Sequence, residues 1–331
     1  MDNIKKYLLG PKNKVFFYIV AVIILLGVPN FVSGAYSLQI FILVFMYAAA
    51  SGSWNIIGGY GGQISLGHSA YFGIGAYITT LLYVNLGVTP WLGMIVGAVI
   101  AAIVACLISY PCFRLRGPFF TLASLAFAEV LRLLCIWARP VTGGQVGITI
   151  LYEPGFSNMQ FPGKAPYYYM VLGLFVIVFM ITKKIENSKF GFYLTALKED
   201  HDAAEALGVN TARYKLYATG ISGFLTALCG AFFAQLLLYI EPAAVFSMDL
   251  SIHFAMMAVV GGAGTVWGPL VGSAILTPLN ELLRGALGGS YQGLNFVIFG
   301  LILILVVTYM PNGIVGFFRD VKKKIYSRYE K

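Results

Sequence analysis

The sequence predicts an all-α fold, a polytopic bundle of transmembrane helices. Of its 331 residues, 59% are hydrophobic and only 11% are charged, whereas a soluble domain carries about 25% charged residues. Residues 15–32 and 38–57 contain no charge at all, and a helix of about 20 apolar residues crosses a bilayer. Most of the chain is therefore unsuited to water, and its apolar runs have the length of membrane spans.

Apolar runs of this kind recur along the whole sequence. We expect about ten spans, near residues 15–33, 38–57, 66–86, 90–112, 118–138, 166–183, 213–236, 245–262, 265–284 and 293–310. Glycine interrupts the third, eighth and ninth, so some of these helices are expected to be broken. The whole chain, 1–331, is then one transmembrane domain that includes a charged segment at about 184–212.

The basic residues predict which ends of the spans face the cytosol. If the spans alternate from a cytosolic N-terminus, most of the 22 lysines and arginines fall inside, and only Arg139, Lys164 and Arg284 fall outside. Basic residues favour cytosolic segments, so both termini and segment 184–212 are expected in the cytosol. This bias explains the net charge of +9, and no nucleic acid is expected as a partner.

Several kinds of catalytic site are missing from the sequence. It contains no GxxxxGK[ST] phosphate-binding loop, no HExxH and no GxSxG. Cysteine occurs at four positions without the spacing of a metal site, so we expect free packing residues at Cys106, Cys112, Cys135 and Cys229. The chain is therefore not expected to be an enzyme, or to bind a metal or a cofactor itself.

Two glycine-rich segments interrupt predicted spans at corresponding places in the two halves of the chain. They are residues 58–77 and 261–269, and each follows a span predicted to run inward and precedes one running outward. Broken helices in matching positions point to a transport path, whereas close helix packing is the alternative use of glycine. The candidates for lining a path are Gln63, Ser65, Gly67, His68, Ser69, Gly261, Gly262, Gly264 and Thr265.

Few charged residues lie inside the predicted spans, which argues against coupling to ions or protons. Glu129 and Arg132 are three residues apart, so they can pair on one face of a helix. Pairing lowers the cost of charge in a membrane, and we expect a structural pair, with a gate as the alternative. His68 is expected to be a neutral hydrogen-bonding residue rather than a group that titrates near neutral pH.

The charged segment 184–212 contains a predicted cytosolic helix. Residues 193–207 lack glycine and proline and are rich in helix-favouring residues. Apolar Leu194, Leu197, Ala204 and Leu207 fall mostly on one side. This stretch is either a solvated loop helix or a docking helix for a cytosolic partner. The docking candidates are Glu199, Asp200, Asp202, Ala203, Ala204 and Gly208, of which Gly208 can end the helix in a left-handed cap.

Two of these segments resemble parts of the branched-chain amino acid ABC importer permeases of the LivM type. Residues 59–68, GYGGQISLGH, are similar to the GYxGQxSLGH signature of that family. Residues 202–208 resemble its EAA-x3-G docking pattern, with Asp202 in place of glutamate. The chain length and the number of spans also agree, so the resemblance covers nearly the whole chain.

The resemblance implies a permease subunit in a bacterial or archaeal plasma membrane. Its implied partners are a second homologous permease subunit, two cytosolic ATPase subunits that use the ATP, and an extracytoplasmic solute-binding protein. The implied solutes are leucine, isoleucine and valine. Relatives that import urea, short amides or other amino acids leave the solute open, and a secondary transporter is a further alternative.

Overall fold

The computed structural model describes residues 25–32, 34–113 and 118–287, together with 297–298, 300–301, 304, 308–310 and 312–319. Within these ranges the chain is mostly helical, and six helical segments are long and apolar enough to cross a membrane. The prediction of a polytopic helical membrane protein is confirmed. The predicted spans at 15–33 and 293–310 lie largely outside the described residues, so the total of about ten spans stays a prediction.

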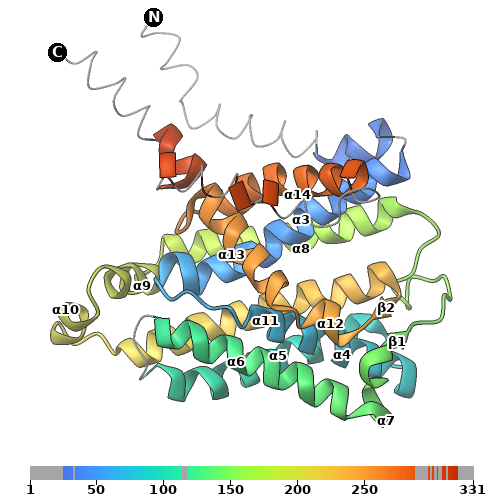
Figure 1. Cartoon of the computed structure of the whole chain (residues 1–331), viewed down its shortest axis with the longest axis horizontal. Coiled ribbons are helices and arrows are strands. Elements are labelled where there is room, and N and C mark those ends of the chain that lie inside the picture. Colours follow the sequence, from blue (N-terminus) through green and yellow to red (C-terminus); the bar gives the residue numbers. More distant parts are fainter. Residues whose placement is uncertain are drawn as a thin grey trace, which may run out of the picture.

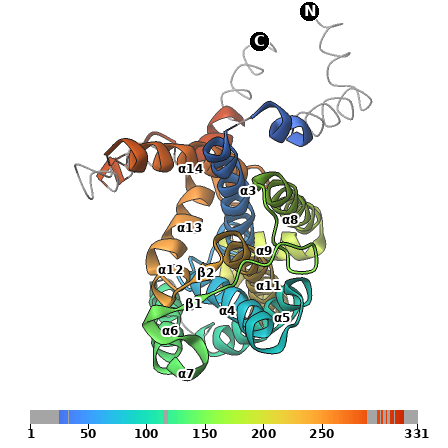
Figure 2. The same cartoon turned by 90° about the vertical axis from the view of Figure 1, so that its right-hand side faces the viewer.

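The long helices run side by side in a bundle (Figure 1). They are α3 (Ala35–Asn55), α4 (His68–Leu86), α5 (Pro90–Cys112), α6 (Pro118–Trp137), α8 (Lys164–Glu186), α11 (Thr211–Leu237), α13 (Met248–Gly262) and α14 (Gly268–Leu287). α11 packs against α4 and α5, while α3 packs against α8 and α14, as the end-on view of Figure 2 shows. α5 has the predicted bounds, because Pro90 suits the first position of a helix. The four cysteines are free.

Short elements lie at the two opposite ends of the bundle (Figure 1). One end carries α9 (Lys189–Glu199) and α10 (His201–Ala206). The other carries α7 (Arg139–Thr142), β1 (Ile148–Thr149), β2 (Tyr239–Ile240) and α12 (Pro242–Val245), with β1 and β2 paired antiparallel. We call them the α9–α10 end and the β1–β2 end. Segment 184–212, predicted to be cytosolic, and Arg139, predicted to lie outside, are thus separated by the length of the bundle.

Glycines on α4 and α11 let the backbones of these two helices touch. A Cβ atom at Gly75 would lie 2.0 Å from the carbonyl oxygen of Ala227, and a Cβ atom at Gly230 would lie 1.9 Å from the carbonyl oxygen of Phe72. Small residues permit such close approach between membrane helices. The glycines of 58–77 thus have two uses. Those before α4 belong to the break between helices, whereas those within α4 permit close helix packing.

Candidate functional site

The first break joins α3 to α4. After α3 the chain makes a wide π-helical turn, Ile56–Tyr60, and residues 61–67 are not helical. The turn requires glycine, because a Cβ atom at Gly58 would lie 2.4 Å from the ring of Trp54. The indole N–H of Trp54 donates to the carbonyl oxygen of Ser65 at 2.7 Å. This one side chain therefore covers the turn and also holds the loop that follows it.

The second break joins α13 to α14. α13 ends at Gly262, and Gly264 has a φ of +78°, a conformation that favours glycine. The hydroxyl of Thr265 donates to the carbonyl oxygen of Gly262 at 2.7 Å and accepts the N–H of Gly268 at 3.0 Å. Thr265 thus closes the turn and satisfies a backbone donor at the start of α14.

Asn55 fastens the two breaks to each other. Its Oδ1 accepts the N–H of Gly264 at 2.8 Å, and its Nδ2 donates to the carbonyl oxygen of Thr265 at 2.9 Å. The side chain is fully buried, and Gly59 leaves it room, since a Cβ atom there would lie 1.8 Å from Asn55 Oδ1. The side-chain amide forms hydrogen bonds with two backbone groups that lack helical partners because the helix is broken. Asn55 was not among the residues predicted from the sequence. A usable signal was present, because an amide side chain stands inside an apolar span just before a glycine cluster.

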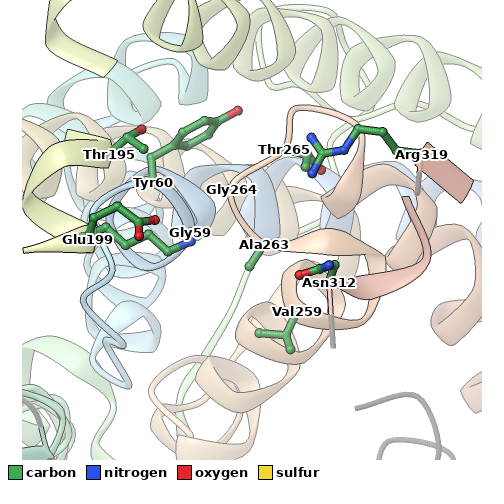
Figure 3. A pocket seen from close by; sticks show the side chains of 11 residues that line it. Gly59, Tyr60, Thr195, Glu199, Val259, Ala263, Gly264, Thr265, Asn312 and Arg319 are labelled. Atoms are coloured by element: carbon green, nitrogen blue, oxygen red, sulfur yellow. The ribbon is translucent and has the colours of Figure 1, made fainter. Parts of the chain in front are cut away.

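The joined breaks form one wall of a pocket at the α9–α10 end (Figure 3). The pocket has a volume of about 400 Å³, and Glu199 and Arg319 enter it from opposite sides. It is lined by Gly59, Tyr60, Thr195, Lys198, Glu199, Val259, Ala263, Gly264, Thr265, Asn312 and Arg319. Non-helical backbone is tolerated at membrane depth where it borders protein or a wet cavity, and this polar pocket meets that condition.

His68 is held in the core by two serines. Its Nε2 lies 2.7 Å from Ser222 Oγ, and its Nδ1 lies 3.0 Å from Ser65 Oγ. The Ser222 hydroxyl donates to the carbonyl oxygen of Ser53 at 2.6 Å. Its oxygen therefore accepts a hydrogen bond from the Nε2–H group, and the Ser65 hydroxyl donates to Nδ1. Every group is then satisfied with a neutral ring. The network supports the predicted neutral role and places the ring between helices.

The predicted path residues fall into two sets. Gly264 and Thr265 line the pocket described above, and Gln63 lines a second pocket of about 480 Å³ between the first break and α6. The remaining candidates are buried and line neither of these two pockets: Ser65, Gly67, His68, Ser69, Gly261 and Gly262. For Gly67 and Gly261 the reason is close packing, because a Cβ atom at either would lie within 3 Å of a carbonyl oxygen.

The predicted docking helix is in fact two helices. α9 ends at Glu199 and α10 begins at His201. Between them Asp200 has an extended backbone, and its Oδ1 accepts the N–H groups of Asp202 and Ala203, both at 3.0 Å. The prediction of one helix across 193–207 is therefore wrong, because the Asp200 side chain caps a new helix.

The docking candidates differ in exposure. Ala204 is only 3% exposed and belongs to the same buried cluster as Leu194 and Leu197. Leu207 was predicted on the buried side but is 86% exposed, because α10 ends before it. Gly208 has a φ of +83°, as a left-handed cap requires. The other candidates, Glu199, Asp200, Asp202 and Ala203, are exposed.

Glu129 and Arg132 form the ion pair that their spacing predicted. Arg132 Nε donates to Glu129 Oε2 at 2.9 Å, and Nη2 donates to Oε1 at 2.5 Å. The Glu129 side chain is 50% exposed and the Arg132 side chain 28% exposed. The pair therefore lies on the surface of this chain and does not stabilise its buried core.

Comparison with known proteins agrees with this architecture. Residues 36–307 match the family model described as branched-chain amino acid transport system / permease component. The chain is 24% identical to the high-affinity branched-chain amino acid transport system permease protein LivM of Escherichia coli K12, over 95% of this chain and 78% of that protein. A probable LivM permease protein of Methanocaldococcus jannaschii is 23% identical, over 74% of this chain and 77% of that protein.

A second kind of relative is named LivH. The LivH permease protein of Salmonella typhimurium is 26% identical to this chain, over 82% of this chain and 91% of that protein. No solved structure matches the chain. Because the family model covers most of the sequence, this chain belongs to the family of branched-chain amino acid transport system permease components.

Proposed function

We propose that this chain is a permease subunit of an ATP-driven importer for leucine, isoleucine and valine. Family membership and the names of the relatives support this class of solute. Its partners are a second homologous permease subunit, two cytosolic ATPase subunits and an extracytoplasmic solute-binding protein in a prokaryotic plasma membrane. ATP is used by the partners, and this chain supplies part of the path.

The contact between α9 and the first break is the observation that carries this proposal. The Lys198 side chain lies against the backbone of Gly62, where a Cβ atom would be 2.8 Å from Lys198 Cγ. Lys198 and Glu199 also line the pocket that both breaks border. A partner that moves α9 would therefore move the first break, and Asn55 would carry the movement to the second. Such a movement can open or close the pocket.

The contact surface for the ATPase would be α10 and the turn that follows it. Ala204 holds α10 on the chain's own core, whereas Leu207 projects from it and is 86% exposed. An apolar side chain that projects from a helix is suited to anchor it in a groove of a partner. Leu207 therefore takes the anchoring role, and Ala204 positions the helix.

Replacing Leu207 by glutamate should uncouple ATP hydrolysis from uptake. A charge in an apolar partner groove costs about 2 kcal/mol or more, so initial uptake of radioactive leucine should fall about tenfold or more. The measurement uses proteoliposomes that contain all the subunits, with ATP on the ATPase side and the binding protein on the other. Ala196→Glu, at an exposed position of α9, is the matched control and should leave uptake near the wild-type rate.

The same assay tests the solute and the energy source. Leucine uptake by the wild-type importer should require ATP and should be competed by isoleucine and valine, but not by urea or acetamide. Uptake driven by an ion gradient without ATP would indicate a secondary transporter and contradict the proposal. Undiminished uptake by the Leu207→Glu variant would contradict docking through α10.

A further inference from the structure

α6 buries only one narrow side within this chain. Its buried residues are Phe120, Ser124, Ala128 and Cys135. The opposite side carries an exposed stripe whose spacing follows the helical period, namely Leu122, Ala126, Glu129, Leu133 and Trp137. Glu129 lies in the middle of this stripe, so its carboxylate points away from the rest of the chain.

Glu129 lies near the middle of α6, one of the helical segments that are long and apolar enough to span a membrane. α6 has 20 residues, so it is about 30 Å long, and Glu129 lies about 16 Å from its start. The hydrocarbon core of a bilayer has about the same thickness as the length of α6. Charged side chains at this depth are costly in lipid and face protein or water instead. Lipid chains therefore do not cover this face of α6.

The first two turns of α6 also contact the first break. Thr121 Oγ1 donates to the carbonyl oxygen of Ile64 at 2.7 Å, and Ser124 Oγ accepts the N–H of Leu66 at 3.0 Å. The pocket of about 480 Å³ that Gln63 lines lies beside these contacts and is also lined by Leu122. Through Leu122, this mainly apolar pocket adjoins the exposed stripe, in which Glu129 lies two helical turns further along.

We propose that Glu129 and Arg132 form a binding site for an α-amino acid zwitterion, on a path that the second permease subunit closes from the other side. This inference rests on the proposed function. A guanidinium binds a carboxylate with two parallel hydrogen bonds, and Glu129 accepts the ammonium group of the same molecule. Val130 and Leu133, both exposed beside the pair, offer apolar surface to a branched side chain.

This site needs no net charge in the membrane. When it is empty the two side chains neutralise each other, and when an amino acid binds they exchange partners with its two charges. A neutral solute such as urea could form hydrogen bonds with the pair, but it has no charges to replace the ionic contacts between the two side chains. The site therefore selects for zwitterions within a family whose members could otherwise share one path.

The test uses the complete importer in proteoliposomes and measures initial leucine uptake. Glu129→Gln and Arg132→Gln should each lower uptake about tenfold or more, because each leaves one charge unpaired. The double variant Glu129→Gln/Arg132→Gln decides between the roles, since it leaves no unpaired charge. A zwitterion site requires that it also lose about tenfold or more. Wild-type uptake by the double variant would show a merely structural pair and overturn the proposal.

Two further variants keep the test decisive. Gly173→Gln, at an exposed position of α8 where an added side chain meets no neighbouring atom within 4 Å, should retain most of the wild-type uptake. If the glutamine variants do not assemble, Glu129→Asp/Arg132→Lys keeps both charges but moves them, and the apparent KM for leucine should rise about fivefold or more. An unchanged KM would overturn the site. A wild-type importer that takes up no amino acid would instead overturn the proposed function, whereas normal leucine uptake in the wild type and in the double variant would overturn only the zwitterion site.

Discussion

The Gly230→Leu variant should fail to form a stable bundle. A Cβ atom at this position would lie 1.9 Å from the carbonyl oxygen of Phe72. The clash cannot be relieved by a change of rotamer, because the Cβ position and the carbonyl oxygen are both fixed by helix backbones. α4 and α11 would have to separate, which would open the packing of the Phe72 ring on Phe233 of α11. We expect a loss of about 4 kcal/mol or more, measured as a lower melting temperature and a lower yield of monodisperse protein in detergent.

Gly173→Leu is the control for this prediction. Gly173 is an exposed glycine of α8, and a Cβ atom added to it would meet no neighbouring atom within 4 Å. Its replacement should leave the melting temperature unchanged or slightly higher, because glycine disfavours helix by about 1 kcal/mol. A Gly230→Leu variant that melts like the wild type would contradict the backbone contact between α4 and α11.

The Asn55→Leu variant should assemble poorly and lose most transport. It leaves the N–H of Gly264 and the carbonyl oxygen of Thr265 without the partners that Asn55 provides. Each unpaired buried group costs about 1–3 kcal/mol, and the two breaks would no longer move together. Leucine uptake by proteoliposomes should fall about tenfold or more, with a lower melting temperature.

A control substitution at a second asparagine distinguishes the loss of the link between the two breaks from a general effect of replacing asparagine by leucine. Asn187 also donates its Nδ2 to a backbone oxygen, that of Lys183 at 3.0 Å, but it is exposed. The Asn187→Leu variant should keep its uptake and its melting temperature. If Asn55→Leu behaves in the same way as Asn187→Leu, the two breaks are not coupled through this amide.

Local signals in the sequence were enough to place most helices. Pro90 marks the start of α5, and Gly208 adopts the left-handed cap expected of it. The same local reasoning failed at Asp200. The residues on both sides favour helix, so composition alone predicts one continuous helix. The preference of aspartate for the position before a helix was the signal that could have divided them.

Contacts between distant segments could not be read from the sequence. The glycine breaks were predicted from their composition, but their link through Asn55 depends on how α3 and α13 pack. The spacing of Glu129 and Arg132 predicted that they pair, yet spacing does not say which side of α6 faces the rest of the chain. Leu207 was misplaced because the apolar pattern was extended one residue beyond the end of α10.

The side of the membrane on which α10 lies tests the account most directly. Leu207 at the α9–α10 end and Leu151 at the β1–β2 end are 86% and 72% exposed, and each is replaced by cysteine in a chain whose four native cysteines are changed to alanine. A membrane-impermeant maleimide should label the Leu151→Cys variant in intact spheroplasts, and the Leu207→Cys variant only after permeabilisation. Labelling of the Leu207→Cys variant in intact spheroplasts, with protection of the Leu151→Cys variant, would place α10 beyond the reach of a cytosolic ATPase and contradict the account.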